Sequence, residues 1–439
     1  MKKQLGFWAI LSLVMGNMIG VGIFVLPSVL APFGSLSLIG WGITLVGALF
    51  LALMFSRIST LFPSAGGPYA YARAGLGDFI GFQTAWTYWI SLWIGSVATI
   101  VSTIGYLSVF FPTLMSDRHI TLGFGLFVVW GLTLINLVSI SVSGRFQIVM
   151  TVLKLLPLVL LVVFGLPHIE AVNFSVFNPS DKPFIMALIE VVTITMWAFI
   201  GVESATIPSD YVENPKRNIP LGTFWGTLLV GLIYISISAL VIGIVPNDLL
   251  QNVPAPFALA AQAILGSKGA LIVAATAVIA AVGSLNGWFL IQAQIPMAAA
   301  QDELFPHQFG KTDKRGVPAF GLIVSAILMS LLLVVSQQKT LVQTFQFMIT
   351  LGTLSILVTY LFSALSELVF YVERPETFKR KNLLKVLALA VPTITYILFA
   401  IYGAGRDVIM WGSLLFFGSA PLYVLVRFQK SRAKLSKQS

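Results

Sequence analysis

Cysteine is absent from this chain of 439 residues, which excludes disulfides, thiol catalysis and cysteine-ligated metals. Only three histidines occur and they do not cluster, so we expect neither a metal centre nor a cofactor. Charged residues make up 10% of the chain, whereas soluble domains carry roughly a quarter. Hydrophobic residues make up 57%. The composition therefore predicts a chain that lies in a lipid bilayer rather than in water.

Long uncharged segments recur along the whole sequence. Residues 4–56 contain no charged side chain, which is enough for two membrane spans of about 20 residues each. Division at charges and turn residues gives about twelve candidate spans, at residues 6–30, 36–58, 79–112, 121–140, 146–166, 184–207, 220–246, 269–300, 317–337, 341–368, 384–403 and 408–426. We therefore predict an all-α polytopic membrane protein with no soluble domain.

The net charge of +10 is unevenly placed. With twelve spans and an inner N-terminus, the lysines and arginines fall on the inner side or its adjacent helix ends, apart from five: Arg118, Lys182, Lys268, Lys339 and Arg406. The positive-inside rule then predicts that both termini are cytoplasmic. We expect the basic tail, residues 431–439, to contact lipid headgroups, and we do not expect nucleic acid as a partner.

Two of the apolar spans are interrupted at matching places by glycine and polar residues. The first interruption is Gly16-Asn17-Met18-Ile19-Gly20-Val21-Gly22-Ile23-Phe24, and the second is Trp197-Ala198-Phe199-Ile200-Gly201-Val202-Glu203-Ser204-Ala205. A helix broken at mid-membrane frees backbone groups that only protein or a ligand-filled cavity can satisfy. Paired breaks in corresponding positions of two halves are the best sequence indication of a transporter's binding site.

The positions of the breaks also predict the domain organisation. Each broken span opens a run of five spans, which is typical of a five-plus-five inverted repeat. We expect one transporter domain over residues 1–430, with a first repeat at about 6–166 and a second at about 184–368. Two further helices would follow at about 384–426.

The residue types at the breaks predict the class of ligand. If the first span unwinds, a new half-helix begins near Val21 and Gly22, and its free N–H groups suit a carboxylate. Unwound carbonyls around Met18, Trp197 and Ile200 suit an ammonium group. An α-amino acid carries both groups, so the substrate class follows from backbone rather than from a charged side chain.

Two charged residues lie deep in the apolar spans. Glu203 stands at the second break, where it is either a proton sensor coupled to opening or a structural acceptor that ties spans together. Lys154 lies in the fifth span. It either snorkels to the inner interface or points inward and takes the place of a bound ion.

Two further carboxylates in the apolar spans say less about function. Glu190 is interpreted either as lining an outer vestibule or as a near-interface residue with an ordinary partner, and Glu367 as structural. The polar residues inside the spans form no set of nucleophile, base and orienting group, so the chain is not predicted to be an enzyme.

Several motifs resemble one family of transporters over nearly the whole chain. They are the two interrupted segments together with Ser64-Ala65-Gly66-Gly67-Pro68-Tyr69-Ala70-Tyr71-Ala72-Arg73, Glu213-Asn214-Pro215-Lys216-Arg217-Asn218-Ile219-Pro220 and Gly283-Ser284-Leu285-Asn286-Gly287-Trp288. By these motifs the chain is identified as a member of the amino acid–polyamine–organocation superfamily. It is most similar to the branch of bacterial arginine/agmatine and polyamine antiporters.

The resemblance implies roles for single residues. It implies that N–H groups of Val21 and Gly22 bind the substrate carboxylate, and that carbonyls of Met18, Trp197 and Ile200 bind its amino group. The side-chain roles that it implies are an occluding gate at Trp197, an aromatic contact for the cationic head at Trp288, distal pocket positions at Ser96 and Gly352, an inner gating and pH-sensing pair at Tyr88 and Glu203, and further gate-region tyrosines at Tyr69 and Tyr360.

This chain departs from the antiporter pattern at several of these positions. Val21 replaces a serine, Ser96 an asparagine and Gly352 a serine, while Leu92 replaces another small residue. Lys154 falls where the antiporters are apolar, and resembles the lysine that other branches place at a vacated sodium site. These changes weaken the arginine assignment and leave amino-acid recognition intact.

The leading hypothesis is an exchanger of a cationic amino acid and its amine product or another amino acid, in a bacterial cytoplasmic membrane. The alternative is proton-coupled transport of neutral amino acids, with protons as a further partner, motivated by Lys154 and the thinner distal pocket. A receptor that does not transport is disfavoured, because no extramembrane domain exists to report occupancy. Related transporters are commonly dimers, but nothing in the residues requires a homodimer.

Overall fold

The computed structural model describes residues 5–62, 67–138, 144–206, 212–373 and 383–435. Within these residues the chain is helical throughout, apart from turns and one isolated bridge between Leu5 and Val212. Ten helices are long and apolar enough to cross a membrane in the described part of the chain. The described residues also contain two shorter apolar helices, Phe7–Met18 and Lys154–His168. Together these helices confirm the prediction of an all-α polytopic membrane protein.

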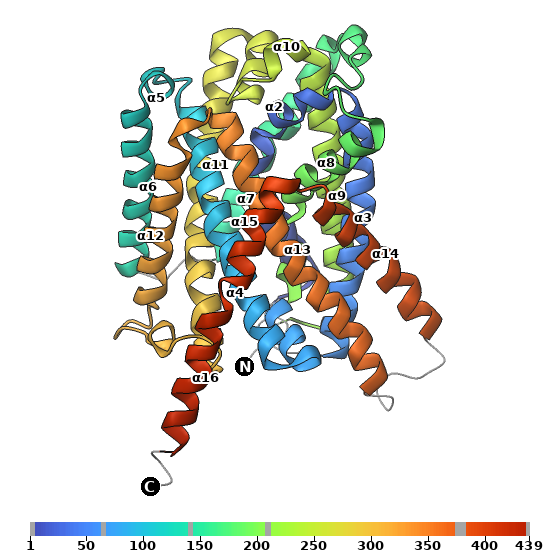
Figure 1. Ribbon diagram of the computed structural model, residues 1–439. Helices are drawn as coiled ribbons and strands as arrows, with labels where there is room; N and C mark the ends of the chain where they lie inside the picture. Colours follow the sequence, from blue (N-terminus) through green and yellow to red (C-terminus); the bar gives the residue numbers. More distant parts are fainter. Residues whose placement is uncertain (1–4, 63–66, 139–143, 207–211, 374–382, 436–439) are drawn as a thin grey trace.

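The two chain ends and the short connecting helices lie toward opposite ends of the molecule. Figure 1 marks both ends of the chain in the lower half of the molecule, while the short helices α2 (Leu26–Leu30), α5 (Thr113–Ser116) and α10 (Asn247–Leu250) lie at the upper end. An even number of crossings places both ends on the same side of a membrane. The repeat boundaries near residues 6–166 and 184–368 stay a prediction.

The first predicted span is a helix, a break and a second short helix. α1 (Phe7–Met18) ends at mid-span, the 3₁₀ turn η1 (Val21–Phe24) follows, and α2 completes the crossing. The sixth predicted span is broken in the same way, with α8 (Phe184–Met196) followed by the 3₁₀ turns η5 (Trp197–Phe199) and η6 (Val202–Thr206). Both predicted interruptions are therefore present.

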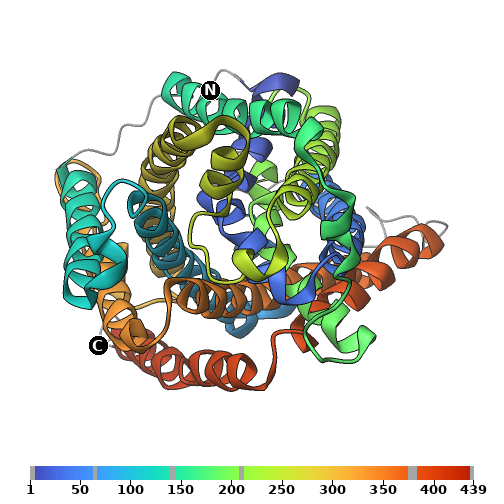
Figure 2. The same cartoon turned by 90° about the horizontal axis from the view of Figure 1, so that it is seen from above.

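The unbroken helices surround these two segments, as the view from above shows (Figure 2). They are α3 (Leu36–Leu61), α4 (Pro68–Leu107), α6 (Arg118–Val138), α7 (Gly144–Gly165), α9 (Pro215–Ile244), α11 (Pro256–Gln301), α12 (Ala319–Val335), α13 (Leu341–Glu373), α14 (Leu383–Tyr402), α15 (Arg406–Phe417) and α16 (Ala420–Leu435). The most extensive packing is between α4 and α13, followed by α4 with α11 and α3 with α9. α1 packs along α9, so the broken segments lie inside the bundle.

Three predicted spans have different boundaries in the structure. α4 begins at Pro68 rather than at 79, and α11 begins at Pro256 rather than at 269. Each is two helical segments joined at a glycine with positive φ, Gly77 at 84° and Gly266 at 69°. Division at charges and turn residues cuts each element beside this glycine, where Asp78 follows Gly77 and Lys268 follows Gly266, and so misses the helical segment before it. The span predicted at 408–426 is likewise two helices, α15 and α16.

Candidate functional site

The first break leaves an extended residue between two helical segments. Gly20 has φ −101° and ψ 179°, and η1 begins at the next residue. The first N–H groups of a helix have no partner within it, so in the i→i+3 pattern of this 3₁₀ turn the N–H groups of Val21 and Gly22 are free of intrahelical bonds. The backbone position of Val21 is described, whereas its side chain lies outside the described residues.

The carbonyl of Met18, at the end of α1, is already fully engaged. It accepts hydrogen bonds from the N–H of Gly20 at 2.8 Å and from the hydroxyl of Tyr234 at 2.8 Å. A carbonyl oxygen has two lone pairs, so this arrangement weighs against the predicted contact of Met18 with a substrate amino group. The carbonyl of Trp197 accepts one hydrogen bond, from the N–H of Ile200 at 3.3 Å, and the substrate contacts of Trp197 and Ile200 stay predictions.

The second break meets the first one directly. Ile200 is extended, and Gly201 has φ 104°, a conformation that L side chains rarely adopt. A Cβ at Gly201 would lie 3.2 Å from the carbonyl carbon of Asn17. Glycine is therefore required here both by its dihedral angle and by the close approach of the two broken segments.

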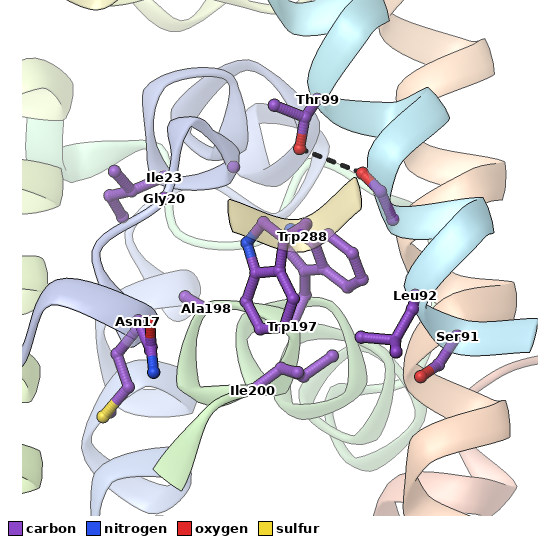
Figure 3. A pocket seen from close by; sticks show the side chains of 13 residues that line it. Asn17, Gly20, Ile23, Ser91, Leu92, Thr99, Trp197, Ala198, Ile200 and Trp288 are labelled. Atoms are coloured by element: carbon purple, nitrogen blue, oxygen red, sulfur yellow. Dashed lines mark hydrogen bonds between the residues drawn. The ribbon is translucent and has the colours of Figure 1, made fainter. Parts of the chain in front are cut away.

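A cavity of about 50 Å³ lies between the two breaks and α4. It is lined by Asn17, Met18, Gly20, Gly22, Ile23, Ser91, Leu92, Gly95, Thr99, Trp197, Ala198, Ile200 and Trp288 (Figure 3). This volume holds a few water molecules and is far below the several hundred Å³ of a typical ligand pocket. None of these lining residues is charged, so a ligand there would meet backbone groups, hydroxyls and aromatic faces.

The indole of Trp197 occupies the space that a larger cavity would need. Three glycines from three elements pack against it: Gly22 of η1, Gly95 of α4 and Gly352 of α13. A Cβ at Gly22 would overlap the indole nitrogen of Trp197, one at Gly95 would lie 2.6 Å from Cη2, and one at Gly352 would lie 3.0 Å from Cζ3. The closed position of Trp197 therefore depends on the absence of side chains at all three positions.

The structure brings together five of the predicted substrate contacts and separates two. Met18, Gly22, Trp197, Ile200 and Trp288 line the cavity. Ser96 and Gly352 are absent from its lining; Gly352 reaches the site only through its contact with Trp197.

Ser96 lies on the wrong face of α4 for the predicted role. Its hydroxyl donates to the carbonyl of Leu92 at 3.0 Å and to Oε1 of Gln292 at 3.3 Å. The face of α4 that lines the cavity carries Ser91, Gly95 and Thr99. Their spacing of four residues is the helical signal that could have identified this face, and it was missed, as was Asn17.

Glu203 is fully buried below the second break and has three donors. Tyr88 donates to Oε1 at 2.8 Å, Tyr360 to Oε2 at 2.5 Å, and the N–H of Gly201 to Oε2 at 3.1 Å. The carboxylate thus connects α4 and α13 to the broken segment. Both interpretations of Glu203 are compatible with this geometry, since a structural acceptor and a proton sensor need the same contacts.

Tyr69 belongs to a different group of residues from Tyr88 and Tyr360. Its hydroxyl donates to Oδ2 of Asp302 at 2.7 Å, and Arg73 forms an ion pair with the same carboxylate at 2.7 Å. This contact joins the first segment of α4 to the end of α11. The structure therefore separates two tyrosines that the sequence interpretation grouped together.

Lys154 is buried, with 2% of its surface exposed. Its Nζ donates to the hydroxyl of Ser284 at 3.3 Å. A Cβ at Gly20 would lie 3.8 Å from that hydroxyl. The side chain of Ser284 therefore lies between the ammonium of Lys154 and the unwound backbone of the first break. Within the described residues it pairs with no carboxylate. Burial contradicts the snorkelling interpretation.

Glu190 and Glu367 have ordinary partners. Glu190 forms an ion pair with Lys182, and Glu367 forms one with Arg57. The contact of Glu367 agrees with its structural interpretation, and Glu190 has the ordinary partner that one of its two interpretations expects; its distance from a membrane interface stays a prediction.

Comparison with known proteins identifies the family. The profile of the amino acid permease family matches residues 5–426. The cadaverine/lysine antiporter of Escherichia coli (strain K12) is 35% identical over 334 residues, which cover 76% of this chain and 74% of that protein. The putative arginine/ornithine antiporter of Bacillus subtilis (strain 168) is 33% identical over an alignment of 472 residues, covering 98% of this chain and 99% of the relative.

A third similar protein is named for another substrate, putrescine. The putrescine transporter of Haemophilus influenzae is 30% identical over 429 residues, covering 98% of both proteins. The helical fold, the paired breaks and these matches agree. The chain is an integral membrane transporter, not an enzyme, and it belongs to the amino acid permease family within the amino acid–polyamine–organocation superfamily.

Proposed function

We propose that this protein is an antiporter that exchanges a cationic amino acid for its amine product or for another amino acid, by alternating access. The observation that carries the proposal is the meeting of the two breaks at Asn17 and Gly201, beside a cavity that Trp197 closes. The N–H groups of Val21 and Gly22 would bind the α-carboxylate. The carbonyls of Trp197 and Ile200 would bind the amino group.

The names of the relatives favour a cationic substrate. Lysine and cadaverine, or arginine and ornithine, share a cationic group at the far end of an apolar stem, an ammonium in three of them and a guanidinium in arginine. The faces of Trp197 and Trp288 suit both parts, because aromatic rings attract apolar stems and cationic heads. No acidic side chain is needed for this recognition.

The size of the cavity supports a cycle in which Trp197 moves. At about 50 Å³, the space cannot hold a long amino acid while the indole is seated between its three glycines. Substrate entry would displace the ring, and its return would close the site. Lys154 would supply a fixed positive charge beside the first break, so that exchange needs no sodium ion.

One observation favours a second candidate, proton-coupled transport of neutral amino acids. The buried ammonium of Lys154 has only a hydroxyl as its partner among the described residues. A lysine in that setting could release and regain a proton during the cycle, and a cavity without carboxylates would accept a neutral side chain.

A transport assay separates the two candidates. Purified protein is placed in liposomes that contain arginine, lysine, a diamine, leucine or no substrate, and uptake of labelled arginine or lysine is measured with and without a pH gradient. The proposal predicts uptake only into vesicles loaded with an exchangeable substrate, with the fastest uptake against a cationic amino acid or diamine, and none into empty vesicles. Uptake into empty vesicles driven by the pH gradient, or exchange of leucine without exchange of either cationic amino acid, would contradict it.

We also propose that both termini are cytoplasmic, in a bacterial cytoplasmic membrane. Because the chain has no cysteine, single-cysteine variants can be labelled with an impermeant maleimide in intact cells. The orientation predicts labelling of Lys268→Cys from outside and of Lys314→Cys only after permeabilisation. The reverse pattern would overturn the orientation.

A further inference from the structure

A second and much larger hollow lies at the periphery of the bundle, away from the central cavity. It is a groove of about 1170 Å³ between α12, α13 and α15, with residues of α4 and α8 in its floor. In Figure 1, α15 is drawn across α4 and α13, with α12 to their left, and Figure 2 shows the red C-terminal helices on the outer edge of the molecule. The groove therefore opens to the surroundings of the protein, not to the substrate site.

Most of the groove wall is apolar, and its outer part is exposed. α12 contributes Leu328, Leu331 and Val335, and α15 contributes Met410 and Leu415. Leu331 is 57% exposed, which is unfavourable in water and ordinary against hydrocarbon. The lining of α15 extends over ten residues from Arg406 to Leu415, a rise of about 14 Å. This depth matches about half of the hydrocarbon core, that is, one leaflet.

The mouth of the groove carries charges of both signs. Four charged residues line it: Glu190, Lys339, Arg406 and Asp407. Arg406 and Asp407 are exposed, and neither forms an ion pair within the described residues. Lys339 lies 4.4 Å from the ring centroid of Phe347, which leaves its ammonium at the mouth. A ligand that fits must therefore combine an anionic group, a cationic group and a long apolar part.

We propose that this groove binds one phospholipid whose headgroup carries both a phosphate and a primary amine, of the phosphatidylethanolamine class. The phosphate accepts hydrogen bonds from Arg406 and Lys339. The ammonium donates to Asp407 and Glu190, the latter shared with Lys182. The acyl chains lie along α12 and α15. A second copy of this chain is a poorer occupant, because a packed helix would cover the charged mouth without satisfying it.

The floor of the groove connects this lipid to transport. Trp93 and Ile94 of α4 and Leu351 of α13 line the groove, whereas their neighbours Gly95 and Gly352 hold the indole of Trp197 on the other side. A single layer formed by α4 and α13 therefore separates the lipid from the gate. Lipid in the groove limits the separation of these two helices, so its removal is expected to change the rate of exchange.

Native mass spectrometry of the purified full-length protein tests the binding. The protein is titrated with phosphatidylethanolamine, phosphatidylcholine or phosphatidylglycerol. We expect one phosphatidylethanolamine molecule per chain, retained at least about tenfold more strongly than the other two, since each lost charge-assisted hydrogen bond is worth a factor of this order. Equal retention of all three lipids would overturn the proposal.

Matched variants locate the site. Leu331→Trp or Met410→Trp, each of which fills the groove, is expected to abolish the retained lipid, while Leu398→Trp on α14, at a residue 51% exposed and outside the groove, keeps it. The double change Arg406→Gln with Asp407→Asn is expected to remove the headgroup preference, while Lys268→Gln leaves it unchanged. Full retention by both groove-filling variants, or cross-linking of Leu331→Cys between two copies in place of lipid, would refute the assignment.

Discussion

The two helix breaks differ in how their freed backbone groups are satisfied. At the first break the freed carbonyls accept from distant tyrosines: Tyr234 donates to Met18, and Tyr106 donates to the carbonyl of Phe24 at 2.7 Å. The N–H groups of Val21 and Gly22, at the start of η1, are left without a partner in their own helix. At the second break the N–H of Gly201 is bound by Glu203 of the same segment.

This difference gives the two breaks different tasks. The first break presents the free N–H groups of Val21 and Gly22, which suit recognition of a carboxylate. The second break satisfies the N–H of Gly201 within its own segment and carries two large side chains, Trp197 toward the cavity and Glu203 toward α4 and α13. We therefore expect the first break to bind the carboxylate, and the second break to bind the amino group and to close the site.

The largest effect is expected from removal of the acceptor at the second break. Glu203→Ala leaves the hydroxyls of Tyr88 and Tyr360 and the N–H of Gly201 without an acceptor in a buried site, at about 1–3 kcal/mol each. We expect loss of exchange and a clearly lower thermal unfolding midpoint. Glu203→Gln, which keeps an acceptor, should lie between this variant and the wild type. An unfolding midpoint of Glu203→Ala equal to that of the wild type would show that the network does not hold the break.

A smaller loss of exchange is expected from a change at Gly22, where the first break packs against the indole of Trp197 from the second break. Gly22→Ala places a methyl group where the indole nitrogen of Trp197 lies. Overpacking of this kind costs about 1–3 kcal/mol, so exchange should fall by on the order of tenfold. The control is Gly287→Ala, because a Cβ there meets no atom within 4 Å. Equal losses in the two variants would argue against a seated Trp197.

The third prediction concerns the buried ammonium beside the first break. Lys154→Met is expected to slow exchange several-fold without lowering the thermal unfolding midpoint, because an apolar side chain often replaces a buried charge at no cost in stability. Ser284→Ala should reproduce part of the slowing, since it removes the hydroxyl to which Lys154 donates. Unchanged exchange in Lys154→Met would remove this residue from the mechanism.

The smallest effect is expected at the carbonyl of Met18. Tyr234→Phe removes one of its two donors and leaves the N–H of Gly20 in place, so the loss should be about 1 kcal/mol of stability. The thermal unfolding midpoint should decrease slightly, with little change in exchange. Tyr402→Phe, at a residue 59% exposed, is the matched control and should show no shift. A large loss of exchange in Tyr234→Phe would mean that the Met18 carbonyl takes part in binding.

Much of the fold was predictable because the membrane imposes it. Uncharged segments such as residues 4–56 have to be helical in hydrocarbon, and glycine with asparagine in the middle of a span indicates a break. The starts of α4 and α11 were not predictable from hydropathy, since Arg73 and Lys268 lie in helical segments outside the apolar windows.

The candidate site was predictable where it depends on backbone and less so where it depends on orientation. Gly22, Trp197 and Ile200 belong to the breaks, and they line the cavity. Ser96 was chosen by similarity of position, which does not specify the face of a helix; the cavity face carries Gly95 instead. The engagement of Met18 by Tyr234 joins residues 216 positions apart, and no local pattern indicates such a contact.

We expect a bound amino acid to lie between the two breaks, covered by Trp197. Equilibrium binding of the labelled cationic amino acid that exchanges fastest tests this position, when it is measured for the wild type, Trp197→Leu and Trp8→Leu. Trp8 is 75% exposed and far from the cavity lining, so its variant should bind like the wild type. Trp197→Leu should bind about tenfold more weakly or worse, the scale of a desolvated cation–π contact. Equal affinity in all three proteins would contradict the account.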